Sequence, residues 1–125
     1  MMFGRVNQQR EAILKLVIIG DGNSKIAVDA VIDTGFNGDL ILPIEIVSEL
    51  GLVPQGYQKA TLGDGTISQF RVYATTVIWD GDRRLVEVNS ATAGILIGMG
   101  LLEGYKLEVN ATPNGDISLI KLDEI

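Results

Sequence analysis

The chain is organised around the stretch Ala30-Val31-Ile32-Asp33-Thr34-Gly35-Phe36-Asn37-Gly38, in which an apolar run ends abruptly in an acid, a hydroxyl and a glycine. A carboxylate at the end of a buried strand needs hydrogen-bonding partners or a shifted pKa, because removing a charge from water is unfavourable. Thr34 and Gly35 are suited to this task, through a hydroxyl and through backbone N–H groups that glycine lets approach closely. Taken alone, the tripeptide is more typical of an ordinary turn, so its interpretation depends on the rest of the chain.

Length and composition predict one globular, all-β domain. The 125 residues fit a single domain, residues 1–125, with a core over about residues 12–122. A hydrophobic content of 46% with 21% charged residues excludes a disordered chain. Fifteen glycines favour the many tight turns of a β protein.

The missing residue types narrow the chemistry. The chain has no cysteine and no histidine, which excludes thiol, Ser-His and Cys-His catalysis and argues against zinc. We therefore expect no metal and no cofactor, and we expect any acid–base chemistry to use carboxylates, lysine or tyrosine. The net charge of −6 disfavours nucleic acid as a partner.

The sequence also predicts a protein that does not associate with membranes. The apolar run Leu16 to Ile19 is far shorter than the ~20 residues that a membrane span needs. The first residues lack the pattern of a signal peptide, so we expect a cytoplasmic protein.

Hydrophobic periodicity and turn residues predict the order of elements. Residues 1–10 are expected to be loosely held or used at an interface, and Arg83 and Arg84 are expected to be solvated charges beside a turn. A helix over residues 44–50, with Ile44, Val47 and Leu50 on its apolar face, is expected to pack on the core. The expected strands cover residues 12–19, 25–32, 40–42, 74–79, 85–88, 105–109 and 117–122, a hairpin covers 58–73, and a short helix covers 99–103.

The strand over residues 25–32 presents two different faces. Ile26, Val28, Ala30 and Ile32 share one uniformly apolar face. The opposite, mixed face continues into Asp33, so the strand is predicted to deliver this carboxylate away from the main core.

Two further features share the chain with Asp33. A glycine-tipped hairpin turn follows it, and then a second apolar run from Ala93 to Gly98 with a short helix behind it. This order resembles the retropepsin-like aspartic peptidases, and more narrowly their small bacterial members, in which a phenylalanine follows the catalytic tripeptide. The resemblance covers roughly residues 26–122, and three motifs carry it: Val31-Ile32-Asp33-Thr34-Gly35-Phe36-Asn37-Gly38, Leu62-Gly63-Asp64-Gly65-Thr66 and Ile95-Leu96-Ile97-Gly98-Met99-Gly100-Leu101-Leu102.

The resemblance implies a closed, barrel-like acid protease half with one or two short helices. It implies that Asp33 is the catalytic carboxylate of an aspartic endopeptidase. Thr34 and Gly35 would support the active-site loop, with Thr34 bonded to its copy in a second subunit. Further implied roles are the substrate site and flap tip at Phe36, Gly63, Asp64 and Gly65, and the second active-site strand at Ile97 and Gly98.

A mechanism with two carboxylates also follows from general chemistry, without the resemblance to a family. Hydrolysis without histidine, cysteine or metal works if two carboxylates share one proton, so that one acts as the base and the other as the acid. The chain offers only one acid in a suitable setting, so we expect a homodimer whose Asp33 side chains meet at the two-fold axis and act on a peptide or protein substrate. Asp29 and Asp39 are rival carboxylates, and Asp39 is expected to be a surface or turn residue.

Two positions depart from the family pattern. Phe36 stands where viral and eukaryotic relatives usually carry alanine or serine, which is expected to reshape the floor of the substrate site. Gly100 stands where many relatives carry an acidic or amide residue, which is expected to weaken helix capping or a contact between subunits. Two alternatives stay open: a non-catalytic dimeric peptide-binding module with the same fold, and a β-rich interaction protein without a peptide site.

Overall fold

The computed structural model describes residues 1–61, 63–92 and 94–125. Leu62, expected in the hairpin, and Ala93, expected at the start of the second apolar run, lie outside the described residues. The elements in chain order are β1 (Met2–Val6), β2 (Ala12–Ile19), η1 (Asp21–Asn23), β3 (Lys25–Ile32), β4 (Leu40–Leu42), α1 (Ile44–Leu50), β5 (Val53–Thr61), β6 (Ile67–Trp79), β7 (Asp82–Ser90), β8 (Leu96–Ile97), α2 (Met99–Leu102), β9 (Tyr105–Val109), β10 (Asp116–Lys121) and η2 (Leu122–Glu124).

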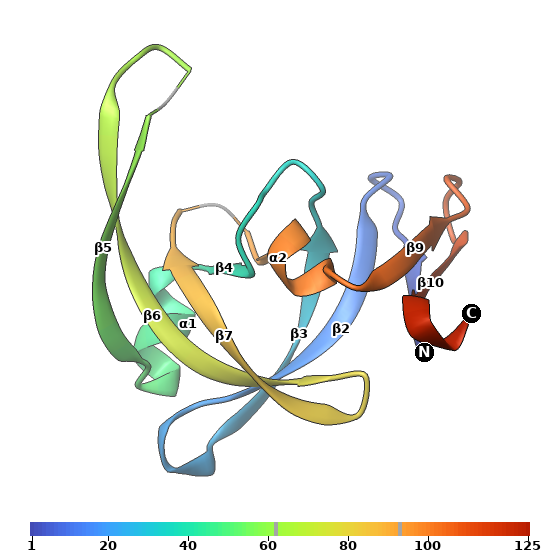
Figure 1. Ribbon diagram of the computed structural model, residues 1–125, viewed down its shortest axis with the longest axis horizontal. Helices are drawn as coiled ribbons and strands as arrows, with labels where there is room; N and C mark the ends of the chain where they lie inside the picture. The colour runs from blue at the N-terminus through green and yellow to red at the C-terminus, as the bar shows by residue number, and fades with distance from the viewer. Residues whose placement is uncertain (62, 93) are drawn as a thin grey trace.

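The strands form one sheet in the order β5-β6-β7-β4-β8-β3-β2-β1-β10-β9 (Figure 1). An additional antiparallel pairing joins β6 to β2, with residues 76–78 of β6 opposite residues 17–19 of β2. The predicted all-β class with short helices is confirmed. The β6–β2 pairing joins β2, β3, β8, β4, β7 and β6 into a ring of paired strands, and β5, β1, β10 and β9 extend outside this ring.

The centre of the sheet is held by the two-residue strand β8. It lies parallel to β3, with Ile97 opposite Ile32, and antiparallel to β4, with Ile97 opposite Leu40. Ile97 and Leu40 are fully buried, and Ile32 is nearly so. Burial of these apolar side chains fixes the ends of β3 and β8 relative to each other, and these ends are directly followed by Asp33 and Gly98.

Strand β3 has the two faces that its sequence predicts. Val28, Ala30 and Ile32 are buried and Ile26 is half-buried, whereas the other face is exposed until Val31. Helix α1 also has the predicted bounds, beginning after Pro43 and ending at Gly51, whose φ of 62° suits a glycine. Val47 and Leu50 are buried, but Ile44 is 47% exposed and does not belong to the core face.

Three expectations about the elements are wrong. Residues 2–6 are not loose, because β1 pairs with both β10 and β2. The predicted boundary between residues 73 and 74 does not exist, since β6 is continuous from Ile67 to Trp79. Arg84 is half-buried and donates hydrogen bonds to the carbonyl oxygens of Leu101 at 3.0 Å and Gly100 at 3.2 Å.

Among the described residues, no helix has the length and apolar character needed to cross a membrane.

Candidate active site

Asp33 begins the loop of residues 33–39, here called the Asp33 loop, directly after the last residue of β3. Its backbone N–H donates to the carbonyl oxygen of Ile97 at 2.8 Å, which continues the β3–β8 pairing by one residue. The N–H of Gly35 donates to Asp33 Oδ1 at 2.9 Å. Asp33 is half-buried and Thr34 is exposed. The structure thus has a partly accessible carboxylate at the end of a buried strand, with one oxygen held by a backbone donor.

Gly98 and Met99, at the end of the second apolar run, form backbone hydrogen bonds with the later residues of this loop. The N–H of Met99 donates to the carbonyl oxygen of Phe36 at 2.7 Å, and the N–H of Gly98 donates to that of Asp39 at 3.0 Å. Gly98 is buried against the aromatic ring of Phe36, and a Cβ atom there would lie 2.7 Å from the carbonyl oxygen of Phe36. A side chain at position 98 is therefore excluded by the Asp33 loop itself.

Phe36 and Gly100, the two positions that depart from the family pattern, both pack closely against neighbouring residues of the site. Phe36 lies over Gly38 and Gly98, so its ring occupies space that two glycines leave free. Gly100 is equally constrained, because a Cβ atom would lie 3.0 Å from the carbonyl oxygen of Gly38 and would overlap Oδ1 of Asp39. Gly100 also donates its N–H to the carbonyl oxygen of Gly38 at 3.0 Å.

The rival carboxylates have other contacts. Asp39 lies in a bend, as expected, but it is half-buried and its Oδ2 accepts a hydrogen bond from the N–H of Glu87 at 3.0 Å. Asp39 therefore ties the Asp33 loop to β7. Asp29 is exposed on the outer face of β3 and pairs with Lys15 at 3.3 Å.

Strands β5 and β6 form the long hairpin that the glycine-rich motif predicts, and Figure 1 shows it extending beyond the rest of the sheet. At its tip, Asp64 Oδ1 accepts hydrogen bonds from Thr66 Oγ1 at 2.6 Å and from the Thr66 N–H at 2.9 Å. These bonds stabilise the ionised form and lower the pKa of Asp64, the hydroxyl bond more than the backbone bond. Gly65 has a φ of 87°, a conformation that favours glycine.

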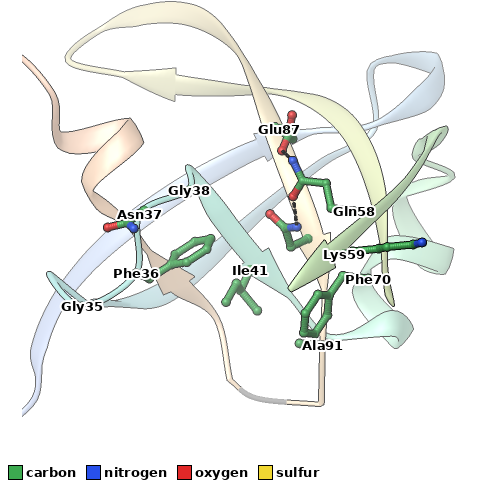
Figure 2. Close-up of a pocket in the computed structure, with 11 residues that line it drawn as sticks. Gly35, Phe36, Asn37, Gly38, Ile41, Gln58, Lys59, Phe70, Glu87 and Ala91 are labelled. Atoms are coloured by element: carbon green, nitrogen blue, oxygen red, sulfur yellow. Dashed lines mark hydrogen bonds between the residues drawn. The ribbon is translucent and has the colours of Figure 1, made fainter. Parts of the chain in front are cut away.

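A pocket of about 690 Å³ lies between this hairpin and the Asp33 loop (Figure 2). Asp33 does not line this pocket but lies at its edge, because its Oδ1 accepts a hydrogen bond from the N–H of the lining residue Gly35. The lining residues come from the loop, β4, the hairpin, β7 and the residue that follows β7: Gly35, Phe36, Asn37, Gly38, Ile41, Gln58, Lys59, Phe70, Glu87, Asn89 and Ala91.

The structure separates the predicted site residues into two groups. Asp33, Gly35, Phe36, Ile97 and Gly98 lie together around the Asp33 loop. The predicted flap residues Gly63, Asp64 and Gly65 lie at the exposed hairpin tip and do not line the pocket.

Four pocket residues are not predicted from the sequence: Gln58, Phe70, Glu87 and Asn89. A signal was present for two of them. Glu87 and Asn89 alternate with Val86 and Val88, which are buried, so they share the opposite face of β7.

No protein-family model and no curated protein sequence matches the chain. A structure search finds a retropepsin-like aspartic protease from Rickettsia conorii, with a TM-score of 0.61 and 17% sequence identity over 93% of this chain and 87% of that one. At this identity the likeness establishes the fold.

Proposed function

We propose that this chain, which has the retropepsin-like fold, is an aspartic endopeptidase that acts as a homodimer. The observation that carries the proposal is the setting of Asp33. Its carboxylate is partly accessible, its Oδ1 is held by the N–H of Gly35, and it stands at the edge of a pocket beneath a long hairpin. One chain supplies one such carboxylate, so a second copy is needed to complete a pair.

The chemistry proposed for this pair needs no metal or cofactor. Two carboxyl groups about 3 Å apart cannot both ionise, so they share one proton. The ionised carboxylate takes a proton from water, the water oxygen bonds to the peptide carbonyl carbon, and the other carboxyl protonates the carbonyl oxygen. Collapse of the diol then breaks the C–N bond, and the leaving nitrogen takes a proton from the pair. Activity should fall on both sides of an acidic-to-neutral optimum, because one group must be ionised and the other protonated.

The remaining site residues receive supporting roles in this proposal. Thr34 is exposed next to the carboxylate, which suits a contact with its copy across the two-fold axis. The hairpin tip at Gly63–Gly65 would close over an extended peptide, whose backbone would add to the flap as a strand. The second active-site strand, which ends at Gly98, would hold the Asp33 loop in place.

The test compares Asp33→Asn with Asp29→Asn. The amide at position 33 keeps an oxygen acceptor for the Gly35 N–H, so the fold should persist while peptide cleavage is lost. The matched change at Asp29, which is exposed on the outer face of β3 and pairs with Lys15, should leave cleavage in place. Mass spectrometry of a digested peptide mixture measures cleavage, and circular dichroism checks folding. Equal cleavage by Asp33→Asn and the unmodified protein would contradict the proposal, and bound peptide without any turnover would indicate a binding module instead.

A further inference from the structure

One wall of the pocket is a row of polar side chains that crosses from the hairpin to β7. Asn89 Nδ2 donates to Gln58 Oε1 at 3.1 Å, and Gln58 Nε2 donates to Glu87 Oε1 at 3.0 Å. Each amide directs a donor to the next acceptor, so the row ends at the Glu87 carboxylate. Among the described residues, the second oxygen of Glu87 has no hydrogen-bond partner, and it is therefore available to a ligand.

The opposite side of the pocket is apolar. Figure 2 shows the side chains of Phe36, Ile41 and Phe70 gathered below Gln58, with Glu87 above it. Phe36, Ile41 and Phe70 are each half-buried, so part of their apolar surface remains accessible to a ligand. Lys59 is the cation in the lining, and in Figure 2 its side chain is directed away from Phe36 and Ile41.

The position of Glu87 is fixed relative to Asp33. Its N–H donates to Asp39 Oδ2 at 3.0 Å, and the neighbouring residue Val88 pairs with Leu40 in the register of β7 and β4. Asp39 is the last residue of the Asp33 loop, and Leu40 directly follows it. A substrate side chain that reaches Glu87 is therefore held at a defined offset from the catalytic carboxylate.

We propose that this pocket is a subsite for a basic substrate residue, lysine or arginine. The aliphatic stem of such a residue would cover Phe36, Ile41 and Phe70, while its cationic end would bond to the free oxygen of Glu87. The net charge of −6 would favour the approach of cationic peptides over the long range. This inference rests on the proposed peptidase function and adds the substrate class to it.

The experiment measures peptide binding without requiring turnover. Immobilised Asp33→Asn protein selects from a degenerate peptide mixture, and mass spectrometry identifies the retained peptides. The same selection uses the double variants Asp33→Asn/Glu87→Gln and Asp33→Asn/Glu49→Gln. Glu49 is exposed on α1 and outside the pocket, so its change removes the same charge as a matched control.

The expected result is an enrichment of lysine and arginine at one peptide position, about tenfold for a charge-assisted hydrogen bond. Glu87→Gln should abolish the enrichment, Glu49→Gln should keep it, and added salt should weaken it. Retention of no peptide, of peptides without a basic position, or of the same peptides by the Glu87→Gln variant would overturn the inference. Cleavage by the unmodified protein without a basic preference would reject only the subsite. Basic enrichment by Asp33→Asn with no cleavage by the unmodified protein would reject only the peptidase function.

Discussion

The backbone N–H of Asp33 lies 2.8 Å from the carbonyl oxygen of Ile97, one residue beyond the last Cα pair of β3 and β8. The carboxylate is therefore positioned by a contact between segments that are far apart in the sequence. Ile97 is fully buried, so a shift of β8 would have to disturb the core. The Asp33 loop is thus held by packing at its base and by α2 at its far end.

The packing of Phe36 on Gly98 predicts that Gly98→Ala impairs the site more than the fold. The new methyl group would overlap the carbonyl oxygen of Gly38 and lie 2.7 Å from that of Phe36, so the Asp33 loop must move. Overpacking of this kind costs about 1–3 kcal/mol in the free energy of unfolding. A displacement of the loop by about 1 Å should lower peptide cleavage on the order of a hundredfold. Urea unfolding and a peptide cleavage assay measure the two effects.

Gly94→Ala is the matched control for this change. Gly94 is exposed, and a Cβ atom there would have no heavy atom within 4 Å. The free energy of unfolding should stay within about 0.5 kcal/mol of the unmodified protein. Equal effects of the two substitutions would show that the contact between Phe36 and Gly98 does not control the loop.

The hydrogen bonds of Arg84 predict that replacing Arg84 destabilises the protein more than replacing its neighbour Arg83. Its guanidinium donates to the carbonyl oxygens of Gly100 and Leu101, which lie in α2 behind the Asp33 loop. Arg84→Ala should lower the free energy of unfolding by about 1–2 kcal/mol, which corresponds to a fall in Tm of roughly 3–8 °C. Arg83→Ala should change it little, since Arg83 is exposed. Thermal unfolding followed by circular dichroism distinguishes the two, and an equal loss would contradict the contact with α2.

The turn at the hairpin tip should weaken in acid. The side-chain hydroxyl and N–H of Thr66 lower the pKa of Asp64 below its ordinary value of 3.8. Because the folded-state pKa is depressed, these bonds stabilise the turn fully above pH 3.8, and their contribution is lost as the pH falls through the folded-state pKa. Thr66→Val removes the hydroxyl but keeps the N–H, so the pKa of Asp64 should rise partway towards 3.8. NMR titration of the Asp64 carboxyl measures this pKa, and an unchanged value would contradict the assignment.

The sequence predicts elements whose patterns are local. Strand β3 alternates cleanly, α1 lies between Pro43 and Gly51, and the run to Gly98 is apolar enough to indicate a buried strand. The hairpin follows from its glycine-rich turn. These features also locate Asp33, because the end of an apolar strand is visible in the sequence.

The features that the sequence does not reveal depend on distant partners. Strand β1 has one buried residue, Val6, and its Gly4 packs so closely on Ile13 that no Cβ atom fits, so it lacks a periodic signal of its own. Arg84 looks like a solvated charge until α2 supplies its carbonyl oxygens. Gln58 and Asn89 are 31 residues apart, and only the placement of β5 and β7 brings them together.

The proposed pairing of two Asp33 carboxylates predicts a dominant-negative effect of Asp33→Asn. If subunits exchange freely, an equimolar mixture with the unmodified protein leaves about half of the original activity, and a ninefold excess leaves about one tenth, because mixed dimers lack one carboxylate. Asp29→Asn protein in the same excess should not inhibit, since its Asp33 is intact and Asp29 lies outside the Asp33 loop. Sedimentation should show dimers at the assay concentration. Activity that is unaffected by excess Asp33→Asn protein, after subunit exchange has been verified by mass spectrometry of labelled chains, would show that one chain acts alone and would exclude the shared-proton mechanism.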